Sequence, residues 1–240
     1  MSDEMRMYIE VGFNITYLIV VWAMTILMSM RMGEVSKENQ KIANLFRWAF
    51  FLLALGDSGH VGFRVAAYAM GGLEKNGLLL GIGALATAIT VTFFYVVMLY
   101  IWKERYNGKF GLFEYTLLAS VPVRLAVMAF PQNDWGNTVT PVFWGLFRNL
   151  FLVILGVGVL YLYLRDAIEA KDRLFRWMAY CVFFSYLFYT PVILFARNIP
   201  VIGMLMIPKT IMYVAIQFLA YKGLWPQKKA LEAVSASPAD

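Results

Sequence analysis

Charged residues are scarce in this sequence, and histidine and cysteine are nearly absent. Only 15% of its 240 residues are charged, whereas a soluble globular domain carries about 25%. His60 and Cys181 are the single residues of their types, so no zinc site built on several of them can form. Cys181 also has no partner for an intrachain disulfide. We therefore expect neither a soluble domain nor a metal site.

Long apolar runs make up most of the chain, which is 61% hydrophobic. A helix needs about 20 apolar residues to cross a bilayer, and seven segments approach that length. They are Tyr8–Met30, Ile42–Met70, Leu78–Trp102, Gly111–Phe130, Val142–Arg165, Leu174–Ala196 and Pro200–Tyr221. The sequence therefore predicts an all-α, polytopic membrane protein, a seven-transmembrane-helix bundle. A single domain would span residues 1–224, with a disordered cytoplasmic tail at residues 225–240.

The first of these segments is too long for the core of a signal peptide, and acidic rather than basic residues precede it. We expect it to be retained as a helix. In the third segment the small residues Gly81, Gly83, Ala84 and Ala86 predict close helix contact.

Apart from four cations deep in the spans, the lysines and arginines sort to one side of the predicted membrane. That side carries Arg31, Lys37, Lys41, Arg47, Lys103, Arg105, Lys109, Arg165, Lys171, Arg173, Arg176, Lys222, Lys228 and Lys229. The other side has only Arg6, Lys75 and Arg197. Basic loops stay in the cytoplasm, so the N-terminus is predicted outside and the C-terminus inside, in the plasma membrane. The net charge of +6 then reflects topology, and we expect no nucleic-acid partner.

Four cations remain deep inside the predicted spans: Arg64, Arg124, Arg148 and Lys209. Asp57 is the one deep acid, and Glu10 lies near the outer end of the first span. A charge at such depth costs at least a few kcal/mol, at about 2.5–3.5 kcal/mol on insertion scales, and nearly always faces the bundle interior. The residues therefore predict a polar interior.

The polar residues also share helix faces. Asp57, His60 and Arg64 follow an i, i+3, i+7 spacing, which is one stripe of a helix. Other stripes are Thr116, Ser120 and Arg124; Lys209 and Tyr213; Ser185 and Tyr189; and Glu10, Asn14 and Tyr17. We expect these faces to meet in one pocket in the outer half of the bundle. The predicted ligand-binding residues are Asp57, His60, Arg64, Arg124, Arg148, Asn149, Tyr189, Lys209 and Tyr213.

The charge balance of this pocket predicts its ligand. Asp57 can neutralise one cation, either Lys209 or Arg124, and the remaining arginines need an anion, backbone carbonyls or water. A carboxylate, a phosphate or a lipid head group would supply that charge, and Arg148 beside Asn149 could form a fork for an oxyanion. Structural alternatives are open: Arg64 snorkelling to the interface, an Asp57–Lys209 ion pair that fixes helix packing, and a structural His60–Asp57 hydrogen bond.

Two stretches resemble an uncharacterised prokaryotic family of seven-helix membrane proteins. They are Gly56-Asp57-Ser58-Gly59-His60 and Met206-Ile207-Pro208-Lys209-Thr210. The segment Phe130-Pro131-Gln132-Asn133-Asp134-Trp135 and the pair Arg148-Asn149 resemble the same pattern. The resemblance implies a seven-helix fold and brings no activity with it.

The chain is also similar in outline to microbial rhodopsins, which have seven helices, an outer N-terminus and a retinal-binding lysine in the last helix. Lys209 and Asp57 would supply the lysine and its counter-ion. The third span, however, offers Thr87, Thr90 and Thr92 instead of a carboxylate, and Leu205 stands where those proteins usually carry an acid. Retinal is therefore an alternative cofactor, and otherwise no cofactor is expected.

Three functions follow from these residues. The first is binding or transport of an anionic small molecule or lipid head group, which implies a protein that is not an enzyme. The alternative is a seven-helix sensor or receptor, which could bind retinal through Lys209. The third is an intramembrane enzyme with Asp57 and His60 as an acid–base pair, a resemblance to intramembrane hydrolases that rests on Asp57-x-x-His60 alone. Partners would be the lipid bilayer and a second copy of the chain as a homo-oligomer.

Overall fold

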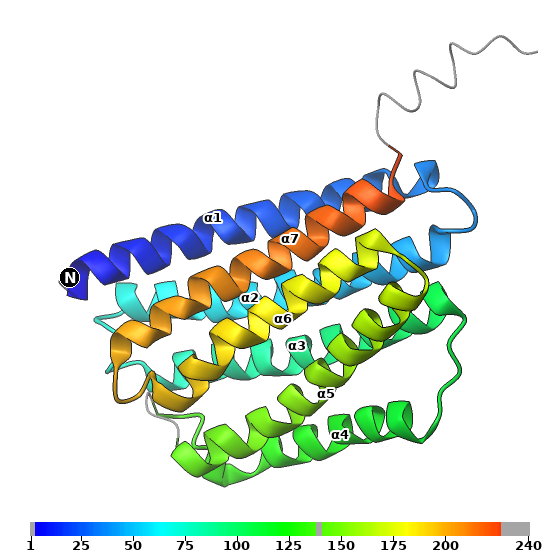
Figure 1. Cartoon of the computed structure of the whole chain (residues 1–240). Helices are drawn as coiled ribbons and strands as arrows, with labels where there is room; N and C mark the ends of the chain where they lie inside the picture. The colour runs from blue at the N-terminus through cyan, green and yellow to red at the C-terminus, as the bar shows by residue number, and fades with distance from the viewer. Residues whose placement is uncertain (1–2, 138–140, 227–240) are drawn as a thin grey trace, which may run out of the picture.

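A computed structural model describes residues 3–137 and 141–226 and shows a bundle of seven α-helices (Figure 1). The helices are α1 Asp3–Met30, α2 Gln40–Ala69, α3 Gly77–Tyr106, α4 Leu112–Ala129, α5 Val142–Glu169, α6 Arg173–Phe195 and α7 Met206–Leu224. Three short 3₁₀ helices join them: η1 Met32–Glu34, η2 Pro131–Asn133 and η3 Pro200–Leu205. No strand occurs in the part of the chain that is described. The prediction of an all-helical bundle is confirmed there.

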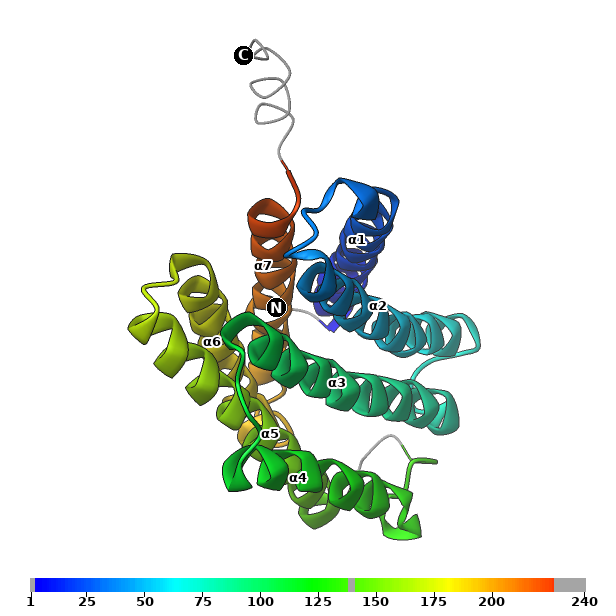
Figure 2. The same ribbon diagram turned by 90° about the vertical axis from the view of Figure 1, so that its right-hand side faces the viewer.

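Each helix packs against the next along the chain, and α7 returns to pack against α1. The helices run side by side along the length of the bundle (Figure 1). Viewed along its axis, α4 stands at one edge, where it packs mainly on α5 (Figure 2). Additional contacts between α3 and α5 and between α2 and α7 hold the middle of the bundle together.

Six helical segments of the described chain are long and apolar enough to cross a membrane. They are Tyr8–Met30, Gly77–Tyr106, Leu112–Ala129, Val142–Glu169, Arg173–Phe195 and Pro200–Leu224. Large apolar side chains such as Ile19 and Leu112 are 64% and 87% exposed on the outside of the bundle. An apolar exterior of this kind is typical of a membrane-embedded protein. The helix α2 does not meet the same criterion, and it is the helix that carries Asp57, His60 and Arg64.

Aromatic side chains fill the half of the bundle in which α1, α3, α5 and α7 end. Phe46, Phe50, Phe94, Tyr95 and Phe175 are all fully buried. The ring centroids of Phe50 and Phe94 lie 5.8 Å apart, and those of Phe46 and Phe175 lie 6.2 Å apart. These distances fall within the range of favourable aromatic contacts. These buried aromatic side chains therefore pack closely in this half of the bundle.

The end of α7 is tied to the end of α1. Arg31 bonds to Glu34 at 2.9 and 2.5 Å, to the carbonyl of Pro226 at 2.9 Å, and to the hydroxyl of Tyr221. Hydrogen bonding from Arg31 lowers the pKa of the Glu34 carboxyl below its ordinary value. Trp225 is only 2% exposed. The folded domain thus continues past residue 224, the predicted boundary, and the remaining tail from residue 227 lies outside the described residues.

Glycines bring α2 and α3 into close contact. A Cβ atom at Gly56 would lie 1.8 Å from the Oγ1 of Thr90, and one at Gly83 would lie 3.1 Å from the carbonyl oxygen of Gly59. Only a residue without a Cβ fits at Gly56 without moving a neighbour. The predicted close packing of the third span is confirmed at Gly83, and it places Asp57 of α2 next to Thr87 of α3.

Candidate functional site

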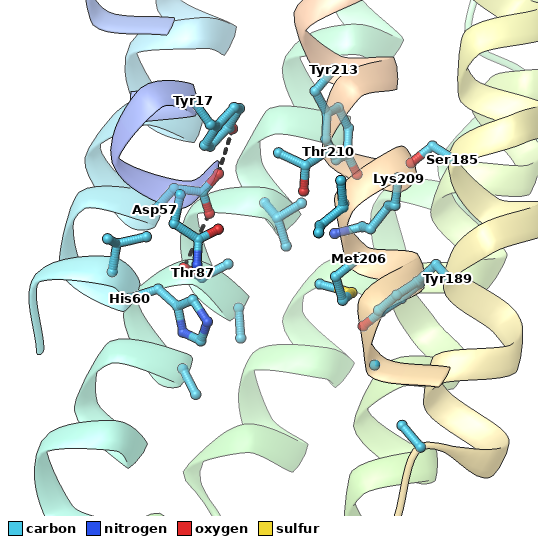
Figure 3. A pocket seen from close by; sticks show the side chains of 18 of the residues that line it. Tyr17, Asp57, His60, Thr87, Ser185, Tyr189, Met206, Lys209, Thr210 and Tyr213 are labelled. Atoms are coloured by element: carbon cyan, nitrogen blue, oxygen red, sulfur yellow. Dashed lines mark hydrogen bonds between the residues drawn. The ribbon is translucent and has the colours of Figure 1, made fainter. Parts of the chain in front are cut away.

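A cavity of about 480 Å³ lies in the half of the bundle where α1, α3, α5 and α7 begin. Its volume falls within the range of small-molecule binding sites. Side chains from all seven helices line it, together with η3 and the loop after η2. The cavity contains every one of the predicted ligand-binding residues: Asp57, His60, Arg64, Arg124, Arg148, Asn149, Tyr189, Lys209 and Tyr213. Figure 3 shows five of them, Asp57 and His60 of α2, Tyr189 of α6, and Lys209 and Tyr213 of α7, around one space.

The lining of the cavity carries more positive than negative charge. Its cations are Arg64, Arg124, Arg148 and Lys209, and its carboxylates are Glu10 and Asp57. With His60 neutral, these four cations and two carboxylates give the lining a net charge of +2. Such an excess in a partly buried site favours an anionic ligand.

The Asp57 carboxylate is held by neutral hydroxyl groups. The hydroxyl of Tyr17 donates to it at 2.6 Å, and the hydroxyl of Thr87 approaches it at 3.4 Å (Figure 3). The predicted pairing of Asp57 with Lys209 or Arg124 is wrong: neither pair occurs among the ion pairs of the described residues. Tyr17 of α1 lies closer to Asp57 and satisfies the oxygen that a cation would otherwise contact.

Lys209 extends from α7 into the cavity between two aromatic rings. Its Nζ lies 4.8 Å from the ring centroid of Tyr189 and 5.2 Å from that of Tyr213 (Figure 3). Within the described chain, the ammonium group makes no hydrogen bond or ion pair. The hydroxyl groups of Tyr213 and Tyr95 form a hydrogen bond of 3.1 Å, which links the cavity to the aromatic half of the bundle. Cation–π contacts stabilise the lysine without neutralising its charge, so its charge stays available to a ligand.

Arg124 is the most deeply buried cation of the site, with 2% of its surface exposed. One guanidinium nitrogen donates to the hydroxyl of Thr92 at 2.7 Å, and its Nε has no hydrogen-bond partner in the described structure. The other members of its predicted stripe, Thr116 and Ser120, do not line the cavity. Their hydroxyls bond instead to backbone carbonyls one turn earlier in α4. That part of the stripe prediction is wrong: Arg124 is the one residue of α4 that lines the cavity, while Ser120 is buried outside it and Thr116 is exposed.

The loop after α4 positions Arg148. The guanidinium group lies 4.2 Å from the ring centroid of Trp135 and donates to the side-chain oxygen of Asn133 at 3.2 Å. Asn133 is itself fixed by donating to the carbonyl of Val127 at 2.6 Å. A Cβ at Gly81 would lie 1.5 Å from the Trp135 carbonyl oxygen, so the loop sits directly on α3.

Asn149 lines the same cavity as Arg148. Its side-chain oxygen accepts a hydrogen bond of 3.1 Å from the hydroxyl of Tyr189 on α6. An oxyanion accepts hydrogen bonds, so it would contact the amide NH2 of Asn149 rather than this oxygen. The fork of Arg148 and Asn149 stays a prediction.

Arg64 has a carboxylate partner, because its guanidinium lies 3.1 Å from Glu10 of α1. This ion pair joins the start of α1 to the end of α2 and leaves Arg64 27% exposed. His60, one turn earlier on α2, lines the same cavity without a hydrogen bond to Asp57 in the described structure. The expected His60–Asp57 hydrogen bond is thus not formed.

The contributions of two residues to the site could not be predicted from the sequence. Thr87 contacts Asp57, and Trp135 stacks on Arg148. In the sequence, Thr87 stands out only as a residue of the third span that is not a carboxylate. Trp135 stands out only as part of the Phe130–Trp135 stretch that resembles a seven-helix family. Among the described residues, no group of three or more His, Cys, Asp or Glu side chains could hold a metal ion.

Comparisons with known proteins add no relative to this geometry. No family model matches the chain, and no curated protein or solved structure is significantly similar to it. The resemblance of the Gly56–His60 and Met206–Thr210 stretches to a prokaryotic seven-helix family stays a prediction, and function must be argued from the cavity itself.

Proposed function

We propose that the chain crosses the plasma membrane seven times, with its N-terminus outside and its C-terminus in the cytoplasm. The helix α2 is the additional span. Its polar stripe lines the cavity, while Trp48, Leu55 and Val65 are 49%, 49% and 39% exposed on its apolar side. A helix with one inward polar face and one apolar outer face is suited to a bundle in lipid. The strong asymmetry of lysines and arginines supports the orientation.

We further propose that the cavity binds an anionic small molecule or lipid head group. The observation that carries this proposal is that three cations of the cavity, Arg124, Arg148 and Lys209, have no carboxylate partner among the described residues. Holding such charges in a cavity costs free energy unless an anion or water compensates them. A bound phosphate or carboxylate would accept hydrogen bonds from these cations.

The closed aromatic half favours a binding protein or an outward-facing transporter over an open channel. Phe50, Phe94 and Tyr95, which are fully buried, lie between the cavity and the predicted cytoplasmic side. Transport would require this half to open. Pro122 of α4 and Pro191 of α6 interrupt helix hydrogen bonding and are suited to such a movement.

A retinal-binding sensor is the second candidate, and the position of Lys209 favours it. Lys209 faces Asp57 across the cavity between two tyrosine rings (Figure 3). Against it, Asp57 bonds to Tyr17 rather than to the lysine, and the α3 side chains in the cavity are Ala84, Thr87, Ala88 and Val91. The third candidate, an enzyme using Asp57 and His60, receives no support from the site, because no hydrogen bond joins the two side chains in the described structure.

A thermal-shift screen of the purified protein in detergent separates these candidates. The panel contains inorganic phosphate, small carboxylates, anionic phospholipids and retinal. Stabilisation by an anion supports the proposed function and names the head-group chemistry. A coloured adduct formed only with retinal would instead support the sensor, and the absence of any anion-dependent shift would contradict the proposal.

A further inference from the structure

A smaller cavity of about 200 Å³ lies between the start of α5 and the end of α6. We call it the α5–α6 groove. It is lined by Pro141, Val142, Gly145, Leu146, Asn149, Ile193, Leu194, Arg197 and Asn198. In the proposed orientation these helix ends lie at the outer surface of the membrane, at the depth of the lipid head groups.

One side chain belongs to both hollows. Asn149 lines the α5–α6 groove and the large cavity. Just after the end of α6, two neighbouring residues line different hollows: Ala196 lines the cavity and Arg197 lines the groove. Between α5 and α6 the boundary is bridged by the 3.1 Å hydrogen bond from Tyr189 to Asn149. The groove and the cavity therefore lie on opposite sides of the same contact between α5 and α6.

The groove combines apolar walls with a cation. Val142, Leu146 and Leu194 are 52%, 38% and 50% exposed, and they stand where acyl chains would contact the bundle. Arg197 and Asn198 are exposed at the outer end of the groove, and either can contact a phosphate or carboxylate. Apolar walls below a cation match the chemistry of an amphiphile with an anionic head group.

We propose that the α5–α6 groove is a lateral passage through which an anionic lipid reaches the cavity from the outer leaflet. Arg197 receives the head group, which then passes the Tyr189–Asn149 hydrogen bond to reach Arg148 and Lys209, while the acyl chain stays against Leu146 and Leu194. This inference rests on the proposed anion site and adds that its ligand is a lipid. A single hydrogen bond between neutral groups contributes only about 0.5–1.5 kcal/mol, so it can open readily.

The test compares a lipid with its soluble head group. The protein is placed in phosphatidylcholine vesicles, and the rate at which fluorescent phosphatidic acid associates with it is measured. Glycerol phosphate binding is measured with the protein in detergent. Leu146→Trp narrows the groove, whereas Leu150→Trp adds the same ring on α5 at a site that is 50% exposed and lines neither cavity. We expect Leu146→Trp to slow lipid association at least tenfold, with glycerol phosphate affinity unchanged and Leu150→Trp like wild type.

Retained glycerol phosphate binding shows that Leu146→Trp is folded. Tyr189→Phe provides an opposite test, because loss of the hydroxyl should speed lipid association severalfold. Equal rates of lipid association in wild type, Leu146→Trp and Tyr189→Phe would overturn the lateral passage while leaving the anion site intact. Binding of glycerol phosphate without phosphatidic acid would also overturn it. If wild type bound neither probe, the anion site would fail first and the passage with it.

Discussion

Asp57 of α2 faces Lys209 of α7 across the cavity, yet its carboxylate bonds to the hydroxyl of Tyr17 at 2.6 Å instead of to the lysine (Figure 3). This relationship decides the electrostatics of the site. A direct ion pair would have neutralised both groups and left a mainly structural contact. With Asp57 held by Tyr17 and Thr87, the charge of Lys209 stays uncompensated within the bundle.

Removal of the Tyr17 hydroxyl should destabilise the bundle. Tyr17→Phe leaves the Asp57 carboxylate with only the 3.4 Å contact from Thr87. A hydrogen bond to a charged group contributes about 1.5–3 kcal/mol, and we expect a loss of that size in the free energy of unfolding. Tyr115→Phe is the matched control, since Tyr115 is 60% exposed and its hydroxyl makes no hydrogen bond in the described structure. Equal denaturation midpoints for the two variants would show that the Tyr17–Asp57 contact contributes nothing.

Close packing of α2 on α3 should depend on Gly56. In Gly56→Ala the new methyl group would lie 1.8 Å from the Oγ1 of Thr90, so the helices must separate and shift Asp57. Overpacking of this kind costs about 1–3 kcal/mol. Gly62→Ala adds the same methyl group on α2 with nothing within 4 Å, and should be neutral or stabilising. Thermal unfolding checks both, and a Gly56→Ala protein as stable as Gly62→Ala would argue against the packing described.

Substitutions of Lys209 separate an anion site from a retinal site. Lys209→Arg keeps the positive charge but cannot form a Schiff base, whereas Lys209→Gln removes the charge. We expect anion affinity to be largely retained in Lys209→Arg and to fall at least tenfold in Lys209→Gln, measured by calorimetric titration. Because the lysine has no ion-pair partner, Lys209→Gln should unfold no earlier than wild type without ligand. Equal anion affinity in wild type and Lys209→Gln would remove this residue from the site.

The single native cysteine makes the topology simple to test. In a Cys181→Ser background, a cysteine is introduced at the exposed positions Ser36 or Lys75, on opposite ends of the bundle. An impermeant maleimide applied to intact cells should label Lys75→Cys and spare Ser36→Cys until the membrane is permeabilised. The reverse pattern would invert the proposed orientation. Labelling of both positions in intact cells would contradict the proposal that α2 spans the membrane.

The helices and the composition of the cavity could be predicted from the sequence, whereas the pairing of its charges could not. Apolar length set the spans, and the spacing of Asp57, His60 and Arg64 placed them on one face that does line the cavity. The partner of Asp57 depends on how closely α1 approaches α2, which no periodicity within one helix encodes. Position along α4 also explains why Thr116 and Ser120 do not line the cavity although they share a stripe with Arg124, since both lie closer to the start of the helix.

Loop residues were the least predictable part of the site. Trp135 reaches Arg148 only because Gly81 lets the loop after η2 rest on α3. That contact joins the start of α5 to the loop before it and, through Gly81, to α3, which is distant in the sequence. Arg148 is thus held by the neutral ring of Trp135 and the amide of Asn133, so that its positive charge is not neutralised by a carboxylate.

The most direct test of the anion site is the affinity of wild type and Arg124→Gln for the anion found in the screen, measured by calorimetric titration. Arg176→Gln is the control, because Arg176 is a partly buried arginine outside the cavity. Breaking a buried charge pair costs about 2–5 kcal/mol, so Arg124→Gln should weaken binding by roughly 30-fold or more while Arg176→Gln binds like wild type. Unliganded Arg124→Gln should be at least as stable as wild type, since it removes an uncompensated charge. Unchanged affinity in a folded Arg124→Gln protein would contradict an anion site at the centre of this bundle.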